Sequence, residues 1–152
     1  MTLTLAPVHW YSWDFDVMDD ARPLARVEMS SWGEKGVVTI DGTDHRLYRE
    51  GVGSGDFILE RAGHRLAKAT KPSAFRSRFE LSYDGWHYTV RKPSVWRREF
   101  IVERGDTQIG SLVRSGWGRA ATVTLPEAWP LAVKVFVMWL AMILWKRESN
   151  AS

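Results

Sequence analysis

The stretch LAVKVFVMWLAMILW, residues 131–145, decides the fold because it is apolar on every face of a helix except at Lys134. A helix of that kind is surrounded either by protein or by lipid. Fifteen helical residues rise only about 22 Å, whereas the hydrocarbon core of a bilayer is about 30 Å thick. We therefore expect a helix over 130–147 that begins at Pro130, ends with Lys146 and Arg147 at its negative pole, and lies buried inside its own protein.

The same segment allows a second interpretation as a membrane anchor. Trp129, Trp139 and Trp145, with the terminal pair Lys146 and Arg147, also suit a membrane interface. A small tail-anchored membrane protein is therefore an alternative. Residues 1–8 carry no basic region of the kind that opens a signal peptide, so we expect a cytoplasmic location, peripheral to a membrane if lipid is the ligand.

Upstream of this helix, three similar segments predict β-hairpins. They read FILERAG (57–63), FELSYDG (79–85) and FIVERG (100–105), with apolar residues at alternate positions and a glycine at the end. A period of two is typical of strands, and Asp-Gly is typical of tight hairpin turns. Second strand-like runs follow at 64–70, 86–91 and 108–114, and further strands are expected at 8–15, 24–31, 36–42, 45–48 and 119–125.

Together these segments predict one mainly β domain over 1–152. We expect a closed antiparallel barrel of about twelve strands with turn signals at even spacing. A barrel that size has room for a helix at its centre, and the small residues Ala67, Ala69 and Ala121 would face that helix. The amine of Lys134 is expected to reach water through one barrel mouth.

Composition narrows the chemistry. The chain has no cysteine, which excludes disulfides, thiolate metal sites and cysteine nucleophiles. Charge is uneven: the net charge is −6 over 1–60, +7 over 61–104 and +2 over 105–152. A basic middle segment suits an anionic partner, unless the acidic first third folds against it and neutralises it.

The most suggestive binding segment is the connection between the second and third hairpins. It places four cations around one tryptophan: Arg91, Lys92, Trp96, Arg97 and Arg98. Cations can hold phosphate while tryptophan enters a membrane interface. Neighbouring cations would join the segment if adjacent connections cluster at one barrel end: Lys68, Lys71, Arg76 and Arg78. The alternative is a solvated surface loop with Trp96 packed on the rim.

The order of these features resembles the tubby-like superfamily, which includes the LURP-one-related proteins and the phospholipid scramblases. The resemblance covers about residues 24–147 and rests on the Phe-initiated hairpins, Gln108-Ile-Gly110, Leu125-Pro126 and the apolar helix ending in Lys146-Arg147. It implies a closed barrel around a C-terminal helix and binding of phosphoinositide or another anionic lipid. It implies no catalytic site. The acidic calcium segment of scramblases has no counterpart here, since Glu127 is the one acidic residue in 115–130.

Other functions find less support in the sequence. His9, His45, His64 and His87 form no ligand-spaced pair, so we predict no metal and no cofactor. The early aspartates at 14, 16, 19 and 20 leave an enzyme of unknown reaction as an alternative. Nucleic acid is not expected, because the net charge is only +3. The sequence therefore predicts a non-catalytic binding module.

Overall fold

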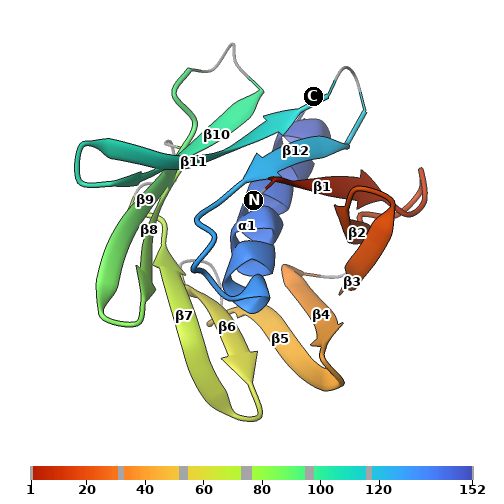
Figure 1. Ribbon diagram of the computed structural model, residues 1–152, viewed down its shortest axis with the longest axis horizontal. Helices are drawn as coiled ribbons and strands as arrows, with labels where there is room; N and C mark the ends of the chain where they lie inside the picture. Colours follow the sequence, from red (N-terminus) through yellow and green to blue (C-terminus); the bar gives the residue numbers. More distant parts are fainter. Residues whose placement is uncertain are drawn as a thin grey trace.

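The computed structural model describes residues 2–30, 33–51, 55–72, 77–94, 98–115 and 118–151, and it is a closed antiparallel barrel with one helix (Figure 1). Each strand pairs with its neighbours in the sequence, and β1 closes the barrel by pairing with β12. The strands are β1 (Thr2–Pro7), β2 (Phe15–Asp19), β3 (Arg22–Met29), β4 (Lys35–Ile40), β5 (Thr43–Arg49), β6 (Phe57–Arg61), β7 (His64–Thr70), β8 (Arg78–Tyr83), β9 (Trp86–Arg91), β10 (Glu99–Arg104), β11 (Thr107–Arg114) and β12 (Ala121–Thr124). The predicted fold class is confirmed.

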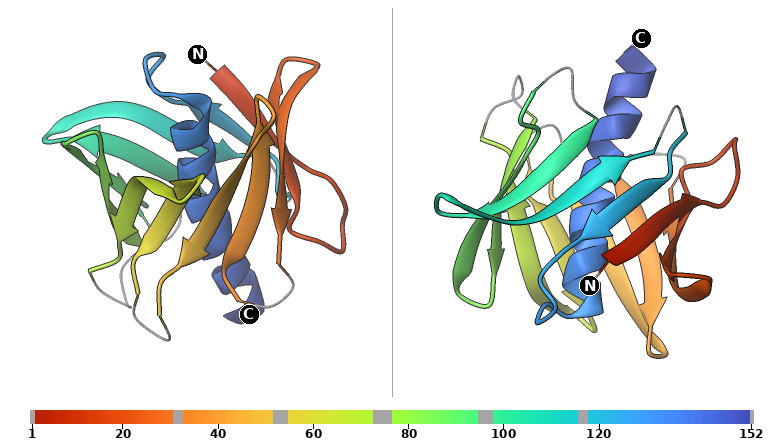
Figure 2. Two further views of the ribbon diagram at one scale, coloured as in Figure 1. Left: turned by 90° about the horizontal axis from the view of Figure 1, so that it is seen from below. Right: turned by 45° about the horizontal axis from the view of Figure 1, so that its top comes forward.

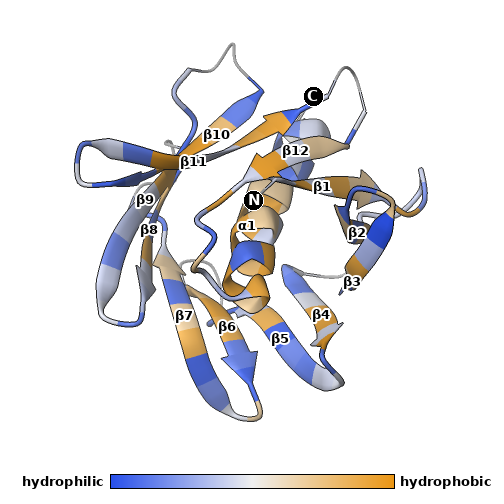
Figure 3. Cartoon of the chain, viewed as in Figure 1, coloured by the Kyte–Doolittle hydropathy of each residue, from blue (hydrophilic) through white to orange (hydrophobic). Residues whose placement is uncertain are grey.

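Helix α1 (Leu131–Ala151) runs through the centre of the barrel (Figures 1 and 2). Every residue from 132 to 145 is buried, so strands cover all faces of the apolar segment. The strands around it alternate in hydropathy along their length (Figure 3). Among the described residues, no helix combines the length and the hydropathy needed to cross a bilayer.

The repeated phenylalanines of the hairpins belong to the core around the helix, and two of them contact its tryptophans. Phe57, Phe79 and Phe100 are fully buried in the core that contains α1. The Phe57 ring meets the Trp139 ring edge-on at 5.7 Å, and the Phe100 ring lies 5.6 Å from the Trp145 ring. The small residues expected opposite the helix, Ala67, Ala69 and Ala121, are buried in the same core.

The hairpin turns follow from their dipeptides. Asp84 and Gly85 both have positive φ, 50° and 77°. Both residues of the Asp41-Gly42 and Ala62-Gly63 pairs also have positive φ. Two consecutive residues with positive φ make the type I′ turn whose twist matches that of paired strands. These turns lie at the barrel end where α1 begins.

Three sequence predictions need correction. The strand predicted over 8–15 is wrong: β1 ends at Pro7, β2 begins at Phe15, and the connection between them is held by a hydrogen bond from the Val8 amide to the Asp14 carbonyl at 3.1 Å. In this connection Trp10 and Tyr11 face solvent, whereas Trp13 packs against the core, so the residues do not alternate as in a strand. Lys134 does not reach out of a mouth but is buried, at 4% exposure.

The helix boundaries also differ from the predicted 130–147. Pro130 precedes the helix and its carbonyl accepts hydrogen bonds from the Val133 and Lys134 amides, so proline caps the helix and does not occupy its first turn. At the other end the helix continues to Ala151, and within its last turn Glu148 accepts a hydrogen bond from Lys92 of the β9–β10 connection. Arg147 therefore lies before the last turn and is available for a side-chain contact.

A glycine of β11 that faces the end of β12 gives a test of this packing. A Cβ atom at Gly110 would lie 2.6 Å from the Thr124 carbonyl oxygen and 3.1 Å from Leu125 Cδ2. We expect Gly110→Ala to lower the free energy of unfolding by about 1–3 kcal/mol, measured by urea denaturation, because backbone has to move to admit the methyl group. Gly36→Ala is the control: its new methyl would meet its nearest atoms at 3.4 Å, so its cost should be clearly smaller. Equal costs would contradict the packing described here.

Candidate anion-binding site at the C-terminal mouth

The barrel end from which α1 emerges is formed by six connections, β1–β2, β3–β4, β5–β6, β7–β8, β9–β10 and β11–β12 (Figure 2). We call this end the C-terminal mouth. Because strands alternate in direction, alternate connections meet at one end, and the predicted clustering of cation-bearing connections follows from barrel closure. Two groups of cations flank the last turns of α1 there.

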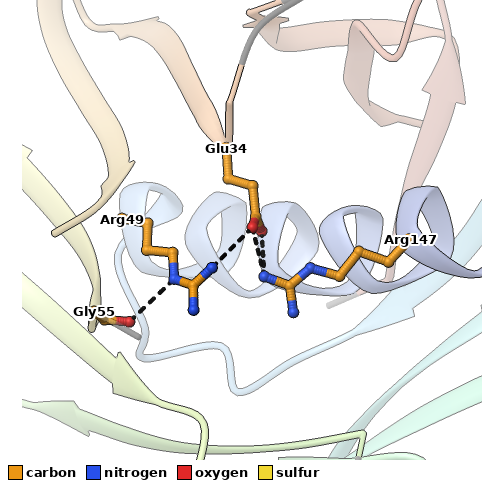
Figure 4. A network of polar contacts seen from close by, with 4 residues as sticks. All are labelled: Glu34, Arg49, Gly55 and Arg147. Atoms are coloured by element: carbon orange, nitrogen blue, oxygen red, sulfur yellow. Dashed lines mark hydrogen bonds and ion pairs between the residues drawn. The ribbon is translucent and has the colours of Figure 1, made fainter. Parts of the chain in front are cut away.

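The first group surrounds Glu34 and is called the Glu34 cluster (Figure 4). The Glu34 carboxylate accepts a hydrogen bond from Arg49 Nη1 at 3.2 Å and from Arg147 Nη2 at 2.8 Å, so strand β5 and helix α1 are joined through the β3–β4 connection. Arg49 Nε also donates to the Gly55 carbonyl at 3.3 Å. Two guanidinium groups therefore share one carboxylate.

Lys71 adds a third cation to the Glu34 cluster. Burial lowers the pKa of Lys71, and repulsion from Arg147 and Arg49 lowers it further, whereas Glu34 acts in the opposite direction. Three cations thus face one carboxylate within a partly buried site. The lowered pKa of Lys71 therefore reflects its burial first and the two neighbouring guanidinium groups second.

The second group, called the Arg114 cluster, contains Arg98, Arg114 and Arg119. A shallow pocket of about 430 Å³ is lined by Arg98, Glu99, Val113 and Arg114. Burial lowers the pKa of Arg114, and Arg98 and Arg119 lower it further, with only Glu148 raising it among the other charges. The Arg114 guanidinium also stacks on the Trp145 ring at 5.2 Å and donates to the Gly118 carbonyl at 2.9 Å. Two contacts therefore orient the Arg114 guanidinium beside the pocket.

Two exposed aromatic residues stand at the same mouth. Trp10 is 86% exposed and Tyr11 is 67% exposed, on the β1–β2 connection. Arg119, in the β11–β12 connection, holds the β1–β2 connection in place. Its guanidinium donates hydrogen bonds to the carbonyls of Ser12 and Trp10, and it stacks on the Trp13 ring at 4.3 Å. The sequence prediction missed these aromatics because it assigned them to a strand; the consecutive residues His9, Trp10 and Tyr11 after Pro7 were the available signal.

The predicted binding residues are only partly brought together. Arg91 lies on the wall and its Nε donates to Glu103 at 2.6 Å, a bond that raises its pKa. Lys92 is largely buried and pairs with Glu148 at 2.7 Å. Arg98 lines the pocket beside Arg114. Trp96 and Arg97 lie outside the described residues.

The neighbouring cations divide in the same way. Lys71 belongs to the Glu34 cluster, whereas Lys68 pairs with Asp56 at 3.8 Å and Arg78 with Glu80 at 3.7 Å. Arg76 lies outside the described residues.

The residues considered for catalysis have structural contacts. Asp14 accepts a hydrogen bond from the Met29 amide at 2.7 Å, Asp16 pairs with Arg26, and Asp19 pairs with Arg22. Within the described ranges, no group of three or more His, Asp or Glu side chains is placed to hold a metal ion.

The Glu34 cluster makes a direct prediction. Glu34→Gln removes the charge that separates the Arg49 and Arg147 guanidinium groups, so we expect a loss of about 1–2 kcal/mol in unfolding free energy, after allowing for the partial exposure of all three side chains. Millimolar inorganic pyrophosphate should restore part of the thermal midpoint, because it supplies the missing negative charge. The control is Glu80→Gln, whose exposed pair with Arg78 lies outside the cluster and should change little.

Comparison with protein-family models, with curated proteins and with solved structures gives no match to this chain. The resemblance to the tubby-like superfamily therefore remains a prediction.

Proposed function

We propose that this protein is a non-catalytic binding module that docks on an anionic membrane surface through its C-terminal mouth. The observation that supports the proposal is the presence, at one barrel end, of two cation-rich clusters together with the exposed Trp10 and Tyr11. The clusters hold phosphate groups of lipid headgroups, and the two aromatic side chains enter the interface between headgroups and acyl chains. The tubby-like resemblance implies the same class of ligand.

The charges suit phosphate in particular. Arginine presents a planar fork that matches phosphate oxygens, and Arg98 and Arg114 line one pocket. At the Glu34 cluster, a phosphate would meet Arg49 and Arg147, which already share one carboxylate, together with Lys71. Anionic lipid attracts a cation at the surface by about 1 kcal/mol, so several cations together give useful affinity.

The aromatic pair Trp10 and Tyr11 adds an interaction with the membrane interface that a soluble anion does not offer. Tryptophan and tyrosine prefer the membrane interface because their rings are apolar and their N–H or O–H groups stay hydrated. Trp10 and Tyr11 meet edge to face at 5.7 Å, and His9 stacks on Tyr11 at 4.8 Å. This preformed aromatic group favours a surface over a soluble phosphate compound.

Vesicle flotation tests the role of the cations. Purified protein should float with phosphatidylcholine vesicles that contain phosphatidylserine and phosphatidylinositol bisphosphate, and high salt should release it. Arg98→Gln and Lys71→Gln should each weaken binding about fivefold, because each removes about 1 kcal/mol of attraction to the surface. Arg61→Gln, an exposed cation at the opposite barrel end, is the matched control and should bind like the parent protein.

The aromatic contribution has its own measurement. The double variant Trp10→Ala, Tyr11→Ala should lose about tenfold or more in vesicle affinity while its binding of soluble inositol phosphate stays unchanged. Trp86→Ala removes an exposed tryptophan from the opposite end and serves as control. If the double variant floats as well as the control, or if neutral vesicles bind as strongly as anionic ones, the proposed function is wrong.

A further inference from the structure

A second binding feature lies at the opposite end of the barrel, where α1 begins. It is a groove of about 630 Å³ between the β8–β9 hairpin, the β10–β11 hairpin and the connection from β12 to α1. Strands β9 and β10 pair only from Ile101↔Arg91 to Glu103↔Thr89, so beyond these residues the two hairpins diverge (Figure 1). This divergence opens the groove. All residues that line it belong to the part of the chain that the structure describes.

Aromatic rings line the groove. Trp129 is at its base, with its ring edge-to-face against Tyr88 at 4.9 Å and against Tyr83 at 6.5 Å. Trp86 is 54% exposed at the rim, where the Arg104 guanidinium stacks on its ring at 5.2 Å. The remaining lining residues are Asp84, Ile109, Pro126 and Ala128.

Several hydrogen-bond donors in the groove have no protein acceptor. Within the described part of the chain, neither the Tyr88 hydroxyl nor the Trp129 indole N–H donates a hydrogen bond to protein, and both polar atoms remain accessible at the surface of the groove. The Tyr83 hydroxyl donates none either. Burial raises the pKa of Tyr83. These donors are open to the groove, where a ligand that accepts hydrogen bonds can engage them.

The balance of donors and acceptors points to a class of ligand. Tyr83, Tyr88, Trp129 and Arg104 present donors, whereas Asp84 provides the only carboxylate among the lining residues. The complementary ligand is rich in acceptors, poor in donors and apolar between them. A proline-rich peptide has these properties, because proline lacks an N–H, keeps its carbonyl and packs its ring on aromatic faces. Its polyproline II conformation leaves every carbonyl free to accept.

We propose that this groove binds a proline-rich segment of a partner protein in the polyproline II conformation. The prolines pack between the rings of Trp86, Tyr88 and Trp129, and peptide carbonyls accept hydrogen bonds from the Tyr88 hydroxyl and the Trp129 indole. Asp84, at the turn of the β8–β9 hairpin, pairs with an arginine or lysine that flanks the prolines and so sets the direction of the peptide. The groove and the C-terminal mouth are at opposite ends, so the protein can hold a membrane and a partner at once.

Titration of the full ¹⁵N-labelled protein, followed by NMR, tests the proposal. The probe is a capped peptide with one arginine followed by a run of prolines. It should shift the indole N–H signals of Trp86 and Trp129 and leave that of Trp10 unchanged. Tyr88→Phe should weaken binding about fivefold by removing one donor, and Trp86→Ala about tenfold by removing one wall. Tyr48→Phe is the matched control, because the Tyr48 hydroxyl donates to Glu60 outside the groove, and it should bind normally.

Three results would overturn the inference. They are an absence of indole shifts at millimolar peptide, equal shifts with a control peptide in which glycine and serine replace the prolines, and binding of a maltose oligosaccharide in place of the peptide. Vesicle flotation of Trp86→Ala separates this inference from the proposed function. The variant should float normally, so loss of peptide binding with retained flotation supports two independent sites, and loss of both indicates that the two ends are not independent.

Discussion

Burial of an all-round apolar helix is the constraint on which this structure depends. Residues 132–145 of α1 have no polar face to offer water, so the strands must surround them completely. A large side chain such as Phe136 or Trp139 contributes about 1.5–3 kcal/mol when fully buried. The strands depend on the helix equally, because without it their inward residues would line a large void. Neither part is a stable unit alone, and the match between Phe57, Phe100 and the helix tryptophans joins them.

The filled centre determines where ligands can bind. Small closed barrels often hold a ligand in the interior, but here α1 occupies that space. The two surfaces that we propose for binding are consequently at the two ends, where connections and hairpin tips leave the wall. The ends differ in chemistry. The mouth around Arg147 and Arg114 concentrates positive charge, whereas the groove around Trp129 offers rings and donors of hydrogen bonds.

The features that the sequence predicted well are local ones. Alternation in the segments beginning at Phe57, Phe79 and Phe100 and the all-round apolar character of 131–145 can be read within a few residues, and both led to the correct fold class. The first part of the chain was harder to predict from the sequence. Residues 8–15 have the aromatic content of a strand, but Pro7 and the Asp14 contact with Met29 turn the chain there, and strand β1 was missed.

The candidate site could be predicted only in part, because it is assembled from distant segments. Glu34, Arg49 and Arg147 come from three parts of the chain and meet only when the barrel closes around α1. Charge content indicated a basic segment over 61–104, but only Lys71 and Arg98 of the two clusters come from it, and the sequence does not show which cations are neutralised. Arg91 and Lys92 have acidic partners on the wall and on the helix, and these partners are not apparent from spacing alone.

Chain order has a consequence for biosynthesis. Helix α1 follows all twelve strands, and the first strand pairs with the last, so the interior remains open until the ribosome has made nearly the whole domain. Until then the hairpins expose an apolar inner surface, which is a hazard for aggregation and a natural substrate for chaperones. Interruption of translation before residue 131 would thus leave a nascent chain with complete hairpins and no core.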